Sequence, residues 1–235
     1  IKIFEIMKYI VSILISLFLF SQVEAQISVK YSVGYGTYSM SDMKGHLSNI
    51  RSEILQIVPG LEIATTDNFP GYVIQSFDVG YRMQKHEFGI TGSYLNTAGK
   101  ISYADYSGKI SSEIKVSGYR GGVFYRNYFY NFDVSKKQNL SFYGEISPGI
   151  IFSKVKIDQE VSPENDKLKL EKSASYNNTS LCLLPQVGVK YSLFSHVGLS
   201  LSVGYEINFG SKIADIERKV DWSGVRFNGG IGYNF

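Results

Sequence analysis

The chain has 235 residues, which suits a single domain, and it contains 18 Tyr, 15 Phe and 23 Gly. Its formal net charge of +3 is too small to indicate a nucleic-acid partner. Cys182 is the only cysteine, so an intramolecular disulfide is excluded, and we expect it to be a small residue inside the fold.

The N-terminal segment has the pattern of a secretory signal peptide. A basic start at Met7-Lys8 precedes an apolar run from Ile10 to Phe20, and Ala25 ends a stretch with small residues where signal peptidase cleaves. The run is shorter than the roughly 20 residues of a membrane-spanning helix. We therefore expect residues 1–25 to be a signal peptide, with Met7 as the initiator, and residues 26–235 to form the domain.

The rest of the chain lacks a continuous apolar run of helical length, so any membrane entry must occur through strands. Overall hydropathy is near zero, as expected when only one face of each strand is apolar. Apolar and polar residues alternate with period two in eight segments, which predicts eight strands. They are Ile27 to Met40, Gly71 to Gln84, Glu87 to Asn96, Glu113 to Arg126, Asn139 to Lys154, Thr179 to Ser192, Val197 to Phe209 and Val225 to Phe235.

The connections between these segments fall into two kinds. Short turns are expected at Lys85-His86 and Leu193 to His196, with a longer, aromatic turn from Asn127 to Gln138. Long loops are expected at Ser41 to Pro70, Thr97 to Ser112, Val155 to Asn178 and Gly210 to Ser223. In outer-membrane barrels the short turns face the periplasm and the long loops face the exterior.

The first long loop contains a helical pattern. Ser41 is a good N-cap, and an apolar stripe recurs at spacings of three and four, while Pro59-Gly60 ends the pattern. The stripe consists of Met43, Leu47, Ile50, Ile54 and Ile57. We expect a helix from Ser41 to Val58 that covers the barrel mouth or packs on its rim; the alternative is a helix that binds a partner or ligand.

The two faces of the strands indicate which side meets lipid. The apolar face carries large rings, whereas the polar face is rich in Gly and Ser, as a narrow barrel interior requires. The opposite assignment would give a soluble, lipocalin-like barrel. We expect charge pairs in the interior because unpaired buried charges are costly. The expected pairs are Arg120 with Glu145 and Glu206 with Arg226.

The last strand ends on an aromatic residue. Asn228, Gly230, Tyr233 and Phe235 follow the spacing of the assembly signal found at the C-terminus of bacterial outer-membrane proteins. In a barrel the last strand closes the sheet, so its end can lie at the membrane edge.

With these features the chain resembles the small eight-stranded outer-membrane barrels of the OmpX and OmpA-transmembrane type. More narrowly, it is similar to the porin-family outer membrane protein beta-barrel domain of Bacteroidetes. The residues that carry this are Ala25-Gln26, Val33 to Met40 leading into Asp42-Met43-Lys44, Tyr103 to Gly108, Pro185 to Tyr191 and the aromatic tail.

The resemblance implies an all-β fold: an eight-stranded antiparallel up-and-down transmembrane barrel with a short helix in its first extracellular loop. It also implies residence in the outer membrane of a Gram-negative bacterium, with extracellular loops and periplasmic termini. The expected partners are outer-membrane lipids, lipopolysaccharide and, during biogenesis, the barrel assembly machinery. We expect a monomer that binds no nucleic acid.

Residues suited to catalysis or metal binding are sparse. His46, His86 and His196 lie in separate loops, and no strand offers a Ser–His–acid cluster at the outer rim, so we expect no enzyme, no cofactor and no metal. The charged loop Asp158 to Lys172 could bind cations or a host surface; the simpler interpretation is that its charges are only solvated. Asp105 suits a Ca²⁺ site or, more simply, a turn.

The expected function is therefore structural, or a surface interaction through the loops of a barrel with a filled polar lumen. A small-solute channel or binder is the alternative. A lipid-modifying barrel enzyme is the third reading.

Overall fold

The structure is a computed structural model that describes residues 26–235, except 58–59, 61–62, 106–107, 136–137, 164–169, 194–195, 211 and 214–217. The expected signal peptide, residues 1–25, lies outside the described residues. Within the described part, no helix is long and apolar enough to cross a membrane.

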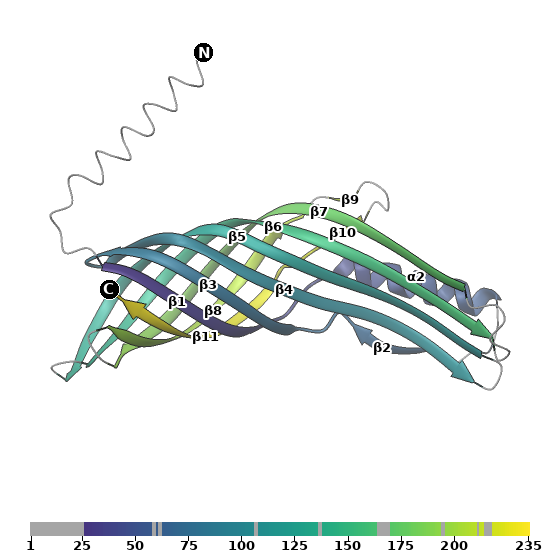
Figure 1. Ribbon diagram of the computed structural model, residues 1–235, viewed down its shortest axis with the longest axis horizontal. Coiled ribbons are helices and arrows are strands. Elements are labelled where there is room, and N and C mark those ends of the chain that lie inside the picture. Colours follow the sequence, from purple (N-terminus) through teal and green to yellow (C-terminus); the bar gives the residue numbers. More distant parts are fainter. Residues whose placement is uncertain are drawn as a thin grey trace, which may run out of the picture.

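Eight strands form a closed antiparallel ring (Figure 1). In ring order these are β1 (Gln26–Gly36), β3 (Tyr72–Met83), β4 (His86–Asp105), β5 (Gly108–Ser135), β6 (Gln138–Pro163), β7 (Leu170–Ser192), β8 (Val197–Phe209) and β11 (Gly224–Asn234). β1 and β11 pair from Ser28↔Asn234 to Gly36↔Arg226, so the last strand closes the barrel on the first. The predicted eight-stranded up-and-down barrel is confirmed.

Four strands continue far beyond the ring and form a protruding sheet at the end opposite the C-terminus (Figure 1). The outer halves of β4, β5, β6 and β7 pair with one another, and β2 (Ala64–Asn68) adds to β4 at one edge. The predicted loops Thr97 to Ser112 and Val155 to Asn178 were therefore wrong over most of their length. The predicted turn Asn127 to Gln138 is also mostly strand, because β5 runs to Ser135.

The physical reason for the two loop errors is an inversion of the faces along these strands. Below Tyr94, Tyr119 and Phe152 the outward side chains are apolar and most of the inward ones are polar, with Phe124 as an apolar exception. Above that level the inward side chains become apolar, and the outward ones become polar or small, such as Lys115 and Lys156. A pattern that changes sign partway along a strand looks like the end of the strand.

The inward apolar side chains of the protruding sheet form a core with the helix α2 (Ser41–Ile57). Met43 and Leu47 of α2 are buried, and Ile50 and Ile54 pack against this core. The sheet contributes Leu95, Ile101, Ile114, Val116, Ile151 and Val155. The predicted helix is confirmed, and its apolar stripe packs on the protruding sheet above the barrel rim instead of covering the mouth of the ring. Val58, its expected last residue, lies outside the described residues.

Candidate functional site

The outer wall of the barrel is an apolar belt with an aromatic rim at each end. Leu201 and Tyr119 are each 65% exposed, and the wall between the rims is largely aliphatic. The rim towards the protruding sheet includes Tyr35, Tyr72, Tyr94, Tyr119, Phe152 and Phe209; the rim at the termini includes Phe88, Phe129, Tyr130, Phe142, Tyr233 and Phe235. Apolar belts flanked by aromatic girdles are the mark of barrels that sit in a bilayer.

The lumen near the termini holds a network of buried charges centred on Arg126. Its guanidinium lies 2.6 Å from a carboxylate oxygen of Glu145, 3.0 Å from Glu87 and 3.4 Å from Asp78. Lys30 completes the network with an ion pair of 2.7 Å to Asp78. Bidentate and shared guanidinium contacts of this kind rigidify a buried site when every member has a partner.

Hydroxyl and amide groups satisfy the remaining oxygens of this network. Ser28 and Tyr128 each donate a hydrogen bond of 2.6 Å to Glu87, and Gln186 donates to Glu145. Lys190 donates to the side chain of Asn234 at 3.1 Å. The cavity that remains among these groups measures about 10 Å³, close to the size of one water molecule.

The upper lumen holds a second cluster, in which two arginines share Glu206. Arg120 lies 3.2 Å and Arg226 lies 3.8 Å from its carboxylate oxygens. Arg120 also donates to the Ser147 carbonyl at 2.7 Å, and Arg226 donates to the carbonyls of Thr37 at 2.7 Å and Trp222 at 2.8 Å. Cys182 is buried nearby, inside the fold as expected.

These clusters place all four predicted lumen charges inside the barrel but change one pairing. The proximity of Glu206 and Arg226 is confirmed. The pairing of Arg120 with Glu145 was wrong, because the β5–β6 register sets Glu145 opposite Arg126 and Ile151 opposite Arg120. Arg120 instead reaches Glu206 across the lumen.

The sequence reasoning missed Lys30 and Glu87 as members of the lumen network. Residue parity already placed both on inward faces. The register supplies their partners, since Lys30 lies directly opposite Asp78 and Glu87 directly opposite Arg126.

The outer mouth of the lumen is filled by an apolar plug. Trp222 is completely buried, packs edge-on against Tyr38 at 4.9 Å between ring centroids, and donates a hydrogen bond of 2.8 Å to Ser153. Met40 and Ile151 are buried in the same cluster. The segments after β1 and before β11 therefore turn inward and close the barrel above the charged interior.

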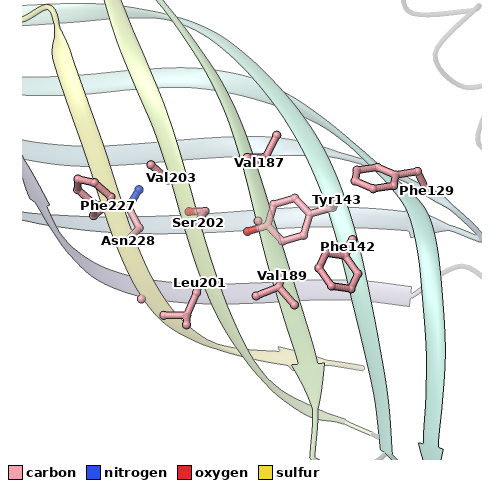
Figure 2. A pocket seen from close by; sticks show the side chains of 12 residues that line it. Phe129, Phe142, Tyr143, Val187, Val189, Leu201, Ser202, Val203, Phe227 and Asn228 are labelled. Carbon is pink, nitrogen blue, oxygen red and sulfur yellow. The ribbon is translucent and has the colours of Figure 1, made fainter.

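A groove of about 720 Å³ lies on the outer wall of the barrel. Figure 2 shows its side chains on adjacent strands, with Val187, Leu201, Val203 and Phe227 among them and Phe129 and Phe142 at one end. Gly229 contributes no side chain to its floor. The outward side chains of the groove are apolar, so it is part of the belt and presents no group suited to acid–base or nucleophilic chemistry.

The histidines are far apart along the chain, and His86 and His196 each have a hydrogen-bond partner on a neighbouring strand. His86 lies 2.8 Å from the Tyr125 hydroxyl, and His196 lies 2.9 Å from the Asn234 carbonyl. His46 belongs to α2, where burial lowers its pKa. Among the described residues, no group of three His, Cys, Asp or Glu side chains is placed to hold a metal ion.

The other polar candidates lie on or near the protruding sheet. Asp158 is on the outer face of β6, where a hydrogen bond from Ser173 and the contact with Lys156 lower the pKa of its carboxyl. Residues 164–169 of the charged segment and the side chain of Asp105 lie outside the described part, so the Ca²⁺ reading of Asp105 stays a hypothesis.

The tail residues occupy the strand that closes the ring. Tyr233 and Phe235 are exposed, with ring centroids 4.9 Å apart, and the Phe235 amide donates to the Ile27 carbonyl at 2.8 Å. Asn228 and Gly230 lie at inward positions opposite Gly34 and Ser32. The assembly role of these four residues stays a prediction.

The ring, the outward apolar belt and the polar interior define the class of up-and-down barrels that cross a membrane with strands. No protein-family model and no curated protein matches the chain. The narrower resemblance to the Bacteroidetes porin-family domain therefore stays a prediction.

Among solved structures the chain is similar to small barrels from several bacteria. It is 15% identical to Ail, the attachment invasion locus protein of Yersinia pestis, with a TM-score of 0.35 and coverage of 90% of this chain and 97% of that one. It is 12% identical to Neisserial surface protein A, with a TM-score of 0.41 and coverage of 90% of this chain and 99% of that one. It is also 12% identical to the outer membrane protein OprG of Pseudomonas aeruginosa, with a TM-score of 0.43 and coverage of 90% of this chain and 95% of that one. Because these scores are low, the barrel assignment rests on the strand pairing described above.

Proposed function

We propose that this chain is an outer-membrane barrel of a Gram-negative envelope, with a structural or surface-interaction role. The observation that carries the proposal is the inversion of faces along β4, β5 and β6. An outward apolar face needs lipid, and an outward polar face with an apolar interior needs water. A single strand with both patterns suits a barrel that leaves the bilayer and continues as a solvated sheet.

The proposed orientation places the protruding sheet outside the cell and the termini in the periplasm. It is supported by the short β3–β4 connection at the end where β1 begins and β11 ends, since short turns face the periplasm in such barrels. A cysteine at Ser175, exposed on the outer face of β7, should react with an impermeant thiol reagent in intact cells. A cysteine at Lys85 should react only after the outer membrane is opened; the reverse result would invert the orientation.

The surface role is supported by the shape of the protruding sheet. From Leu170 to Asn177, β7 pairs with β6 on one side and has no ladder partner on the other side among the described strands. An open edge of this length offers backbone groups to a partner strand. The proposed protein is a monomer that binds no nucleic acid. Its proposed partners are outer-membrane lipids and lipopolysaccharide and, during its insertion, the barrel assembly machinery.

The decisive test between this function and a small-solute channel is single-channel recording in planar bilayers. The charge network and the Trp222 plug support a barrel that conducts no solute, so the membrane current should stay at the baseline of the lipid. Discrete current steps from the purified chain would overturn the filled lumen. We further propose that the chain is not an enzyme and needs no cofactor; an altered lipid A mass in cells that overproduce it would contradict this.

A further inference from the structure

Four lysines gather on the outward face of the protruding sheet, where it leaves the apolar belt. We call Lys100, Lys115, Lys154 and Lys156 the lysine patch. They come from β4, β5 and β6, which are paired neighbours, and their side chains follow the same outward parity as the belt residues Tyr94, Tyr119 and Phe152. Lys115 and Lys156 are about half exposed, at 53% and 52% of their side chains.

The patch begins at the depth expected for lipid headgroups, with Lys154 nearest to the belt. Lys154 is two residues beyond Phe152, which is 55% exposed, and two residues span roughly 7 Å of strand. A bilayer extends some 5–7 Å beyond its hydrocarbon core on each side. Lysine stems are long enough to let the ammonium groups reach this layer from slightly higher positions.

Carboxylates on this face begin farther from the belt. On β5 and β6 the first two outward rows above Tyr119 and Phe152 hold Ser117 and Lys154, then Lys115 and Lys156. Glu113 and Asp158 follow only in the third row. Lys100 of β4 lies in this third row, directly opposite Glu113. The excess of positive charge beside the belt therefore comes from Lys154, Lys115 and Lys156 in the first two rows.

Two members of the patch are held in a repulsive arrangement. Lys115 and Lys156 lie directly opposite each other in the β5–β6 ladder, and like charges in this position destabilise a sheet. Each contacts the carboxylate above it, Glu113 at 3.1 Å and Asp158 at 3.1 Å. Such exposed pairs contribute little, so an anion between the ammonium groups would stabilise the sheet further.

We propose that the lysine patch binds the phosphate groups of lipid headgroups in the outer leaflet. A lipid fits better than free phosphate because the patch continues into the aromatic rim, where Tyr119 is 65% exposed and available to acyl chains or sugar rings. The inference rests on the proposed function, since it requires that this end of the barrel face the outer leaflet.

The test is lipid retention by the purified full chain in detergent micelles, counted by native mass spectrometry with bisphosphorylated lipid A as the probe. Replacing all four patch lysines with glutamine should weaken retention by about tenfold or more, as charge contacts of this kind predict. The matched control replaces four exposed lysines elsewhere, K85Q, K109Q, K212Q and K219Q, and should retain lipid like the parent. A fourfold arginine variant of the patch should also retain it.

Three results would overturn the proposal: equal retention by the glutamine and parent proteins, equal loss in the patch and control variants, or loss in the arginine variant. Dephosphorylated lipid A should be retained no better by the parent than by the glutamine variant. If millimolar inorganic phosphate displaced the probe completely, the site would be one for free phosphate. Each protein is first inserted into liposomes; failure of the parent to insert would refute the proposed function and not the patch.

Discussion

The interior of the barrel contains two clusters of buried charges that depend on single residues to different degrees. Arg126 contacts three carboxylates, whereas Glu206 alone lies between two arginines. Removing one partner of a buried ionic group leaves an uncompensated charge, which costs more than the intact pair contributes. The two clusters should therefore differ in sensitivity, because the lower one has other carboxylates near Arg126 and the upper one has only Glu206 among the described side chains.

Glu206→Gln should lower the free energy of unfolding by about 3–5 kcal/mol, because Arg120 and Arg226 lose their shared carboxylate. Urea titration of the barrel in liposomes measures this. Glu113→Gln, on the exposed outer face, should cost less than about 1 kcal/mol. The double variant Arg120→Met, Glu206→Leu should lose less free energy of unfolding than Glu206→Gln does. If its loss equalled the sum of the losses of Arg120→Met and Glu206→Leu alone, the two residues would be uncoupled.

Ser147 compensates for a proline in the wall. The β5–β6 ladder is interrupted between Gly122 and Tyr125, where Pro148 has no N–H to donate, and the Ser147 hydroxyl donates to the Val123 carbonyl at 3.0 Å. Ser147→Ala should cost about 1–3 kcal/mol, since the Val123 carbonyl and the Arg120 guanidinium, which donates to the Ser147 hydroxyl at 3.0 Å, both lose a hydrogen-bond partner. The same urea titration checks it, with Ser202→Ala as the control; equal effects would remove the special role of Ser147.

At the scale of elements, α2 is attached through its apolar stripe. Leu47 is 2% exposed, so Leu47→Asp should release the helix from the protruding sheet while the barrel below remains closed. Limited proteolysis should then cut within Ser41–Ile57, and the heat-dependent gel shift of the barrel should persist. Asn49→Ala, on the exposed side of α2, should leave the helix protected; cleavage in both variants would mean that the stripe does not anchor it.

The last strand should act both in assembly and in closure. Phe235 is 69% exposed, and its backbone amide makes the final bond to β1, so its ring contributes little to packing. Phe235→Ser should reduce the amount in the outer membrane, yet the same variant should refold in detergent with the parent's stability. Equal loss in cells and in detergent would make Phe235 a packing residue, and normal export would remove the assembly signal.

The strands of the ring could be predicted from the sequence because one rule, apolar outward and polar inward, holds at most of their positions, with Phe124 as an exception. The rule fails from Leu95 and Ile151 onward, because there the apolar residues face inward and the polar residues face outward. The helix was predictable from its own period. The partner of Arg120 was not, because parity assigns a face but only the register and the barrel closure determine which charges meet.

One continuous sheet is suited to lipid in its ring and to water in its protruding part. The ring near the termini has a polar, filled interior and an apolar exterior, and the protruding part has an apolar core under α2 and a polar exterior. The Trp222 plug separates the two interiors. This arrangement is the reason for proposing that the outer surface, and not the lumen, meets other molecules.

The most direct test of this account is the solvent contacted by successive outward positions of β6. Spin labels at Ile146, Phe152 and Lys156, in the chain inserted into liposomes, report collisions with oxygen, which concentrates in lipid, and with a water-soluble nickel complex. The account predicts oxygen contact at Ile146, an intermediate value at Phe152 and nickel contact at Lys156. Nickel contact at Ile146 as well would contradict it and would favour a soluble, lipocalin-like barrel.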